Sequence, residues 1–120
     1  MLPRSARLTE SLGFRQAVRR GRRAGTRTLV VHWWRADSEP LTGPGTRAGF
    51  VVSKAVGNAV VRNRVQRRLR HLTREHLTEL PGRGILVVRA NPAAAEASYE
   101  ELGRDLTKGL ERLGAVEAAS

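Results

Sequence analysis

The 120-residue sequence contains no cysteine, and this absence removes several classes of protein. Disulfide frameworks, zinc sites built from thiolates and cysteine nucleophiles are excluded. Long apolar runs are missing too, since no stretch approaches the roughly 20 residues that a helix needs to cross a bilayer. The start, Met1-Leu2-Pro3-Arg4, is not followed by an apolar segment, so we expect no secretory signal and a cytoplasmic location.

Carboxylates are scarce in the first part of the chain. Residues 1–74 hold 17 of the 22 Lys and Arg residues but only 3 of the 11 Asp and Glu residues, and the whole chain has a formal net charge of +11. Because such an excess repels itself on folding, the usual physical reason for it is a polyanionic partner. Nearly all of the cations are Arg, which can donate paired hydrogen bonds to a phosphate and can stack on a base.

The same scarcity argues against an active site within the chain. The first 74 residues contain only Glu10, Asp37 and Glu39, and the last two lie in an expected loop. A carboxylate cluster for a two-metal nuclease is therefore not expected. His71 and His76 are five positions apart on an expected helix, so they do not share a face as a metal-binding pair would. We predict no catalytic residue and no metal ligand.

Hydrophobic periodicity and turn signals predict a single α+β domain over residues 1–120, an α/β sandwich with helices packed on a small central sheet. The expected order is α-β-β-(β)-α-β-α, in which the bracketed strand would be split from residues 47–54. We expect residues 1–8 and 115–120 to be flexible and residues 19–23 to form a basic turn. The expected elements are a helix at 10–20, strands at 27–35, 47–54 and 84–90, a long helix at 56–79, and a last helix after Ser98.

Two helices carry a clear apolar row at helical spacing. The long helix has Val61, Val65, Leu69 and Leu72, and the last helix has Leu102, Leu106, Leu110 and Leu113. Ser98 and Glu101 have the spacing of a capping box at the start of the last helix. We expect both rows to pack against the sheet.

The long helix is also the most basic segment, with no Asp or Glu from residue 54 to residue 74. On a helical wheel, a row formed by Asn63, Arg67, Arg70 and Arg74 lies opposite the apolar row. A solvated helix surface would mix in Glu to make stabilising pairs with the cations. A surface without them is better explained by phosphates that neutralise it, with release of the counterions condensed on the nucleic acid.

The start of this helix resembles a known family. Its sequence is Lys54-Ala55-Val56-Gly57-Asn58-Ala59-Val60-Val61-Arg62-Asn63-Arg64, which closely resembles the signature of the bacterial ribonuclease P protein component. The resemblance extends over most of the chain. It includes Leu2-Pro3 through Arg7-Leu8, Phe14, the strand before Lys54, and Arg89-Ala90-Asn91-Pro92, all in the expected order.

The resemblance implies a left-handed crossover at the long helix, which pattern reasoning alone would not supply. It implies a protein subunit that binds ribonuclease P RNA and precursor tRNA and assists removal of the 5′ leader. In the family the RNA cleaves the phosphodiester with Mg²⁺, so we expect no ion bound tightly by the protein, no membrane partner and no small-molecule substrate. The residues that match the RNA-binding signature are Lys54, Asn58, Arg62, Asn63, Arg64, Arg67, Arg68 and Arg70.

A second implied surface is a cleft for the single-stranded leader, between the first helix and the sheet. Val18 stands where many relatives carry an aromatic residue, and His32 stands where many carry Tyr. Trp33 or Trp34 could supply the missing ring, although each is more often a core residue. The residues that we assign to this cleft are Phe14, Arg15, Val18, His32 and Trp34.

Two other functions remain compatible with the composition. A ribosomal-type protein or RNA chaperone would have the same charge, and only the motif disfavours it. A DNA-binding regulator is a weaker alternative because no helix-turn-helix or dimerisation heptad is visible.

Overall fold

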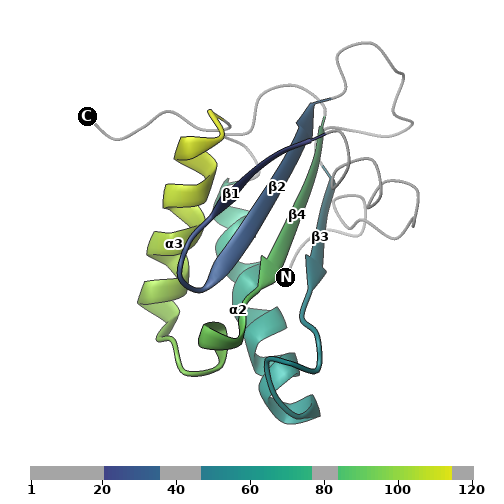
Figure 1. Ribbon diagram of the computed structural model, residues 1–120, viewed down its shortest axis with the longest axis vertical. Coiled ribbons are helices and arrows are strands. Elements are labelled where there is room, and N and C mark those ends of the chain that lie inside the picture. The colour runs from purple at the N-terminus through teal and green to yellow at the C-terminus, as the bar shows by residue number, and fades with distance from the viewer. Residues whose placement is uncertain (1–20, 36–46, 77–83, 115–120) are drawn as a thin grey trace.

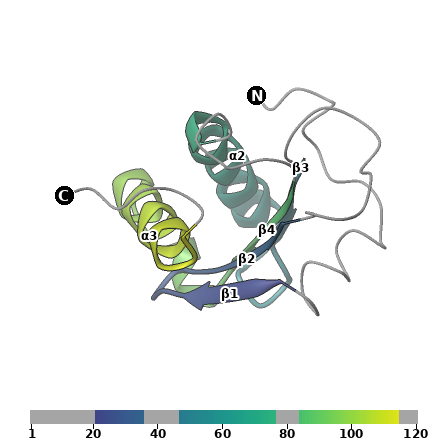
Figure 2. The same cartoon turned by 90° about the horizontal axis from the view of Figure 1, so that it is seen from above.

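The computed structural model describes residues 21–35, 47–76 and 84–114. Within these residues, four strands form one sheet and two helices cover the same face of it (Figures 1 and 2). The expected helix at 10–20 lies outside the described residues. The elements are β1 (Arg22–Gly25), β2 (Leu29–Arg35), β3 (Arg47–Val51), α2 (Ala59–His76), β4 (Gly84–Ala90), the 3-10 helix η2 (Pro92–Ala95) and α3 (Tyr99–Arg112).

The strands are arranged in the order β1-β2-β4-β3. Strand β2 is antiparallel to both β1 and β4, whereas β3 is parallel to β4. Helix α2 makes the connection between these parallel neighbours, and the hand of this crossover stays a prediction. The mixed α+β architecture that the sequence predicts is confirmed.

Strand β1 is the element that the sequence analysis missed. Residues 19–23 were expected to form a basic turn, but Arg22 and Arg23 pair with Trp33 and His32 of β2. The free edge of β2 supplies the hydrogen bonds, so pairing with a neighbour overrides the weak strand propensity of the sequence Arg-Arg-Ala-Gly. The fourth strand therefore comes from this hairpin and not from a split of residues 47–54, where β3 is a single strand.

The hydrophobic core lies between the sheet and the two helices. From β2, Leu29 and Val31 are fully buried and Trp33 is 5% exposed. Both predicted apolar rows are confirmed, although Val61 is only partly buried. The buried members of these rows are Val65, Leu69, Leu72, Leu102, Leu106, Leu110 and Leu113.

Helix α3 begins with half of the predicted capping box. The Ser98 Oγ accepts a hydrogen bond from the Glu101 N–H at 3.0 Å. The carboxylate of Glu101 binds Arg27 in the turn between β1 and β2. The cap therefore satisfies one free N–H of α3, while its acidic residue fastens the helix to the hairpin.

Gly109→Ala should lower the free energy of unfolding by about 1 kcal/mol, even though alanine favours a helix by about the same amount. A Cβ atom at position 109 would lie 2.8 Å from Cγ2 of Val31, which is fully buried in the sheet. Overpacking of this kind typically costs about 1–3 kcal/mol, so it outweighs the gain in helix propensity.

Gly103→Ala is the matched control for this prediction. Its Cβ would meet Cδ2 of Leu72 at 3.1 Å, and that atom is the end of a side chain that can move. We expect urea denaturation to show a neutral or stabilising change for Gly103→Ala. The packing argument would be wrong if Gly109→Ala were at least as stable as the wild type.

Candidate nucleic-acid interface

The start of α2 explains why Gly57 and Asn58 stand in the signature. The Asn58 Oδ1 accepts a hydrogen bond from the Val61 N–H at 3.0 Å, so Asn58 caps the helix. A Cβ on Gly57 would lie 3.0 Å from Cβ of Val61, so only glycine fits without a shift.

The helix was expected from residue 56 but begins at Ala59, because residues 54–56 form a turn first. Residues 77–79 of the expected range lie outside the described residues.

The surface of α2 is divided as the sequence predicts. Val65, Leu69 and Leu72 face the core. On the opposite row Asn63, Arg67 and Arg74 are exposed and Arg70 is partly buried. Of the eight residues predicted to bind RNA, three are partly buried: Arg62, Arg68 and Arg70. The other five are exposed: Lys54, Asn58, Asn63, Arg64 and Arg67. The structure thus brings these side chains onto one helix and the turn before it, and their binding role stays a prediction.

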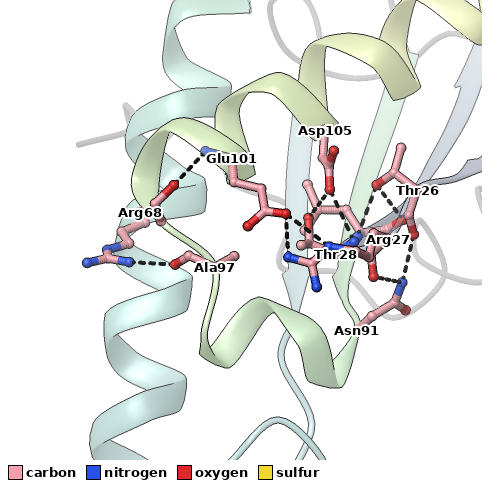
Figure 3. A network of polar contacts seen from close by, with 10 residues as sticks. Thr26, Arg27, Thr28, Arg68, Asn91, Ala97, Glu101 and Asp105 are labelled. Carbon is pink, nitrogen blue, oxygen red and sulfur yellow. Dashed lines mark hydrogen bonds and ion pairs between the residues drawn. The ribbon is translucent and has the colours of Figure 1, made fainter.

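Arg64 and Arg68 lie on the side of α2 that faces the link between η2 and α3. Arg64 Nη2 donates to the carbonyl of Ala95 at 3.0 Å. Arg68 Nη1 donates to the carbonyl of Ala97 at 3.2 Å (Figure 3). Each bond holds a long side chain by one N–H group and leaves most of the five guanidinium donors for another acceptor. The sequence offered no signal for these two bonds.

Two carboxylates of α3 are held away from this basic surface. Glu101 pairs with Arg27, and Asp105 accepts hydrogen bonds from the N–H and the hydroxyl of Thr28 (Figure 3). The Glu101 carboxylate also raises the pKa of Arg27, through their hydrogen bond and their opposite charges. These acidic groups of α3 therefore stabilise the turn between β1 and β2 and do not lie beside the cations of α2.

The predicted leader cleft is described only in part. Phe14, Arg15 and Val18 lie outside the described residues. His32 and Trp34 point to the sheet face opposite α2 and α3, since they alternate with the core residues of β2. Of the two tryptophans, Trp33 belongs to the main core, whereas Trp34 is partly buried against a small cluster of Ile85 and Val87.

Two cations on this sheet face were missed by the sequence analysis. Arg23 lies directly across from His32, and Arg89 of β4 pairs with Val30, the second residue before His32. Only the strand register brings them together, so no local pattern could have revealed them. Burial, and then the positive charges of Arg89 and Arg23, lower the pKa of His32 from its ordinary value of 6.5.

The stability of the protein should therefore depend on pH through His32. His32 is 5% exposed and its Nδ1 has no hydrogen-bond partner among the described residues, so a proton there would be buried beside two cations. The folded state binds this proton less readily than the unfolded chain. The free energy of unfolding should therefore have its full value above about pH 6.5 and decline as the pH falls below it. Urea midpoints at pH 7.5, 6.5 and 5.5 would measure the decline. His32→Asn should make the decline shallower, and an unchanged slope in that variant would show that His32 does not cause it.

Two further features of the described residues bear on function. Among them there is no group of three or more His, Cys, Asp or Glu side chains placed to hold a metal ion. None of the helices found there is both long enough and apolar enough to cross a membrane.

Relatives with similar sequences carry one name. The chain is 58% identical to a ribonuclease P protein component of Nocardioides over 115 residues, which cover 96% of this chain and 97% of the relative. It is 55% identical to the component of Streptomyces griseus over 117 residues, with 94% and 95% coverage.

Solved structures agree with the sequence comparison. The ribonuclease P protein of Staphylococcus aureus superposes with a TM-score of 0.80 at 22% identity, over 93% of this chain and 98% of that one. A protein of Thermotoga maritima, solved with 1-(4-fluorophenyl)-2-thiourea, gives 0.72 at 22% identity, over 92% and 100%. The family model for ribonuclease P matches residues 2–114. This chain, with its capped and Arg-rich α2, therefore belongs to the ribonuclease P protein family.

Proposed function

We propose that this protein is the protein subunit of ribonuclease P, which binds the catalytic RNA and assists endonucleolytic removal of the 5′ leader from precursor tRNA. The observation that carries the proposal is the outward row of α2, which has cations and no carboxylates from residue 54 to residue 74. Phosphates placed along this row would release condensed counterions, so binding should weaken steeply with salt. Membership of the family disfavours the ribosomal-type and chaperone alternatives.

In this proposal the RNA subunit hydrolyses the phosphodiester with Mg²⁺ that it holds itself. The protein contributes positive charge that offsets repulsion between the phosphates of the leader and those of the catalytic RNA. The division of charge supports this role, because guanidinium groups occupy α2 while Glu101 and Asp105 are committed to Arg27 and Thr28. The assembled particle would work in the cytoplasm.

The leader would lie on the sheet face that carries His32 and Trp34. Arg23 and Arg89 on the same face support this assignment, since a single strand needs cations for its phosphates and rings for its bases. Phe14, Arg15 and Val18 would complete the cleft.

A reconstitution experiment tests the proposal. The full chain would be mixed with a bacterial ribonuclease P RNA, and cleavage of precursor tRNA would be followed as Mg²⁺ is lowered. We expect cleavage at Mg²⁺ concentrations where the RNA alone is inactive, and tighter binding of leader-bearing tRNA than of mature tRNA. Equal affinity for the two tRNAs would contradict the proposed leader cleft. Failure to bind the RNA at physiological salt, or cleavage by the protein alone, would overturn the whole proposal.

A further inference from the structure

Helices α2 and α3 lie side by side and contact each other (Figures 1 and 2). The His76 ring is 3.2 Å from the Thr107 hydroxyl, and Arg64 donates to the carbonyl of Ala95; in both pairs the partners are 31 positions apart. Leu72 and Gly103, which also approach each other closely, have the same separation. The pairs Leu72–Gly103 and His76–Thr107 join the two helices, and their residue numbers rise together, so α2 and α3 run in parallel.

This register places Tyr99 next to Arg68. The pairs Leu72–Gly103 and His76–Thr107 follow each other at intervals of one helical turn, and one turn earlier the pair is Arg68 and Tyr99. The hydrogen bond from Arg68 to the carbonyl of Ala97 agrees with this position. Tyr99 therefore lies at the level of Arg68, at the end of the contact between α2 and α3 where both helices begin.

Tyr99 is also one of only two large apolar side chains among the described residues that are exposed, with 40% of its surface accessible. A partly exposed aromatic residue can present part of its ring to a ligand while the rest of the side chain contacts the protein. Its position at the first residue of α3 fixes the backbone, because the Ser98 cap holds the turn. A tyrosine side chain has only two rotatable χ angles, so it loses little conformational freedom on binding.

The charges around this ring favour an anion. Glu101 is two positions from Tyr99, which at about 100° per residue places it on nearly the opposite side of α3, where Arg27 holds it. Glu100 is exposed and lies about 100° around the helix from Tyr99. Glu96 is an exposed carboxylate in the link before α3, and its negative charge acts on Arg27 in the turn between β1 and β2.

We propose that Tyr99, Arg64 and Arg68 form a binding site for one unpaired nucleotide of the RNA subunit. The Tyr99 ring stacks on the base, and the two guanidinium groups bind the phosphates on either side of it. Stacking requires a base that is free of its helix, so the site selects a bulged or single-stranded nucleotide over a paired one. This inference rests on the proposed function. It adds a contact with a nucleobase to the phosphate contacts proposed for the Arg-rich surface of α2.

Tyr99→Leu and Tyr99→Phe test the site in the full chain with a bacterial ribonuclease P RNA. Leucine preserves apolar contact without a π face, and we expect it to weaken binding by about five- to 150-fold, the range for loss of one stacked base. Phenylalanine should bind like the wild type. The slope of affinity against salt should not change in Tyr99→Leu, because every cation that binds a phosphate remains, whereas Arg68→Ala should reduce that slope by about one unit.

Each outcome separates the inference from the proposed function. If the wild type binds the RNA and Tyr99→Leu binds equally well, the nucleotide site is wrong and the proposed function stands. If the wild type does not bind the RNA, both fail. Should Tyr99→Leu unfold, ultraviolet cross-linking of the wild-type complex decides the matter. A cross-link from Tyr99 to an unpaired nucleotide supports the site, and cross-links to paired nucleotides or only to other residues overturn it.

Discussion

Replacing Arg67 and Arg70 together with glutamate is expected to weaken binding to ribonuclease P RNA by about a hundredfold, or roughly tenfold for each position. Both residues lie on the row of α2 that points away from the core, Arg67 exposed and Arg70 partly buried. Each change removes a cation that binds a phosphate and adds a charge that repels the RNA. Affinity measured from low to high salt should also fall less steeply, by about 0.9 units of slope for each phosphate that the protein no longer neutralises.

The matched control is Arg104→Glu with Lys108→Glu on α3. Both of these side chains are exposed, and the change in net charge is identical. Neither residue belongs to the row of α2 that is proposed to bind phosphates, and salt screens exposed charges outside direct contacts, so we expect only a small loss of affinity. Equal losses in the two double variants would mean that net charge, and not the surface of α2, determines binding.

Asp105→Ala should lower the free energy of unfolding by about 2–4 kcal/mol. Thr28 is fully buried, and both its N–H, at 3.1 Å, and its hydroxyl donate to the Oδ2 of Asp105. Alanine leaves two buried donors without an acceptor, and each unsatisfied donor costs about 1–3 kcal/mol. Urea denaturation at constant pH measures the loss.

Two further variants separate the hydrogen bonds from other effects of Asp105→Ala. Asp105→Asn keeps an acceptor oxygen and should lose less stability than alanine. Thr28→Val removes the hydroxyl alone, so its cost should be smaller in the Asp105→Ala background than in the wild type. Strictly additive losses would show that Thr28 and Asp105 do not stabilise the hairpin as a pair.

The helices could be predicted from the sequence because their signals are local. An apolar side chain at every third or fourth position defines α2 and α3, and Ser98 marks the start of α3. Strand β1 was missed because its partners, β2 and the end of α3, are brought to it by the fold, and nothing in the sequence Arg-Arg-Ala-Gly indicates that pairing. The start of α2 was placed three residues early because the turn at residues 54–56 carries no Pro or Gly that would announce it.

In the candidate site, too, the residues placed by local spacing could be predicted, and those placed by long-range packing could not. The outward row of α2 follows from helical spacing alone, so Asn63, Arg67 and Arg70 could be found without a structure. Arg23 and Arg89 meet His32 only through the register of three strands. The bonds from Arg64 and Arg68 to backbone carbonyls likewise depend on the packing of α2 against the link after η2.

The strand order has a consequence for synthesis of the chain on the ribosome. Strands β2 and β3 are not neighbours, and each pairs with β4, which ends at Ala90. A nascent chain can form the β1–β2 hairpin early, but the sheet stays in two parts until about three quarters of the polypeptide has been made. Contacts between residues so distant in sequence form slowly. The Arg-rich segment of α2 therefore leaves the ribosome before its apolar row has a complete sheet to cover, and nascent chains truncated before β4 should be prone to aggregate.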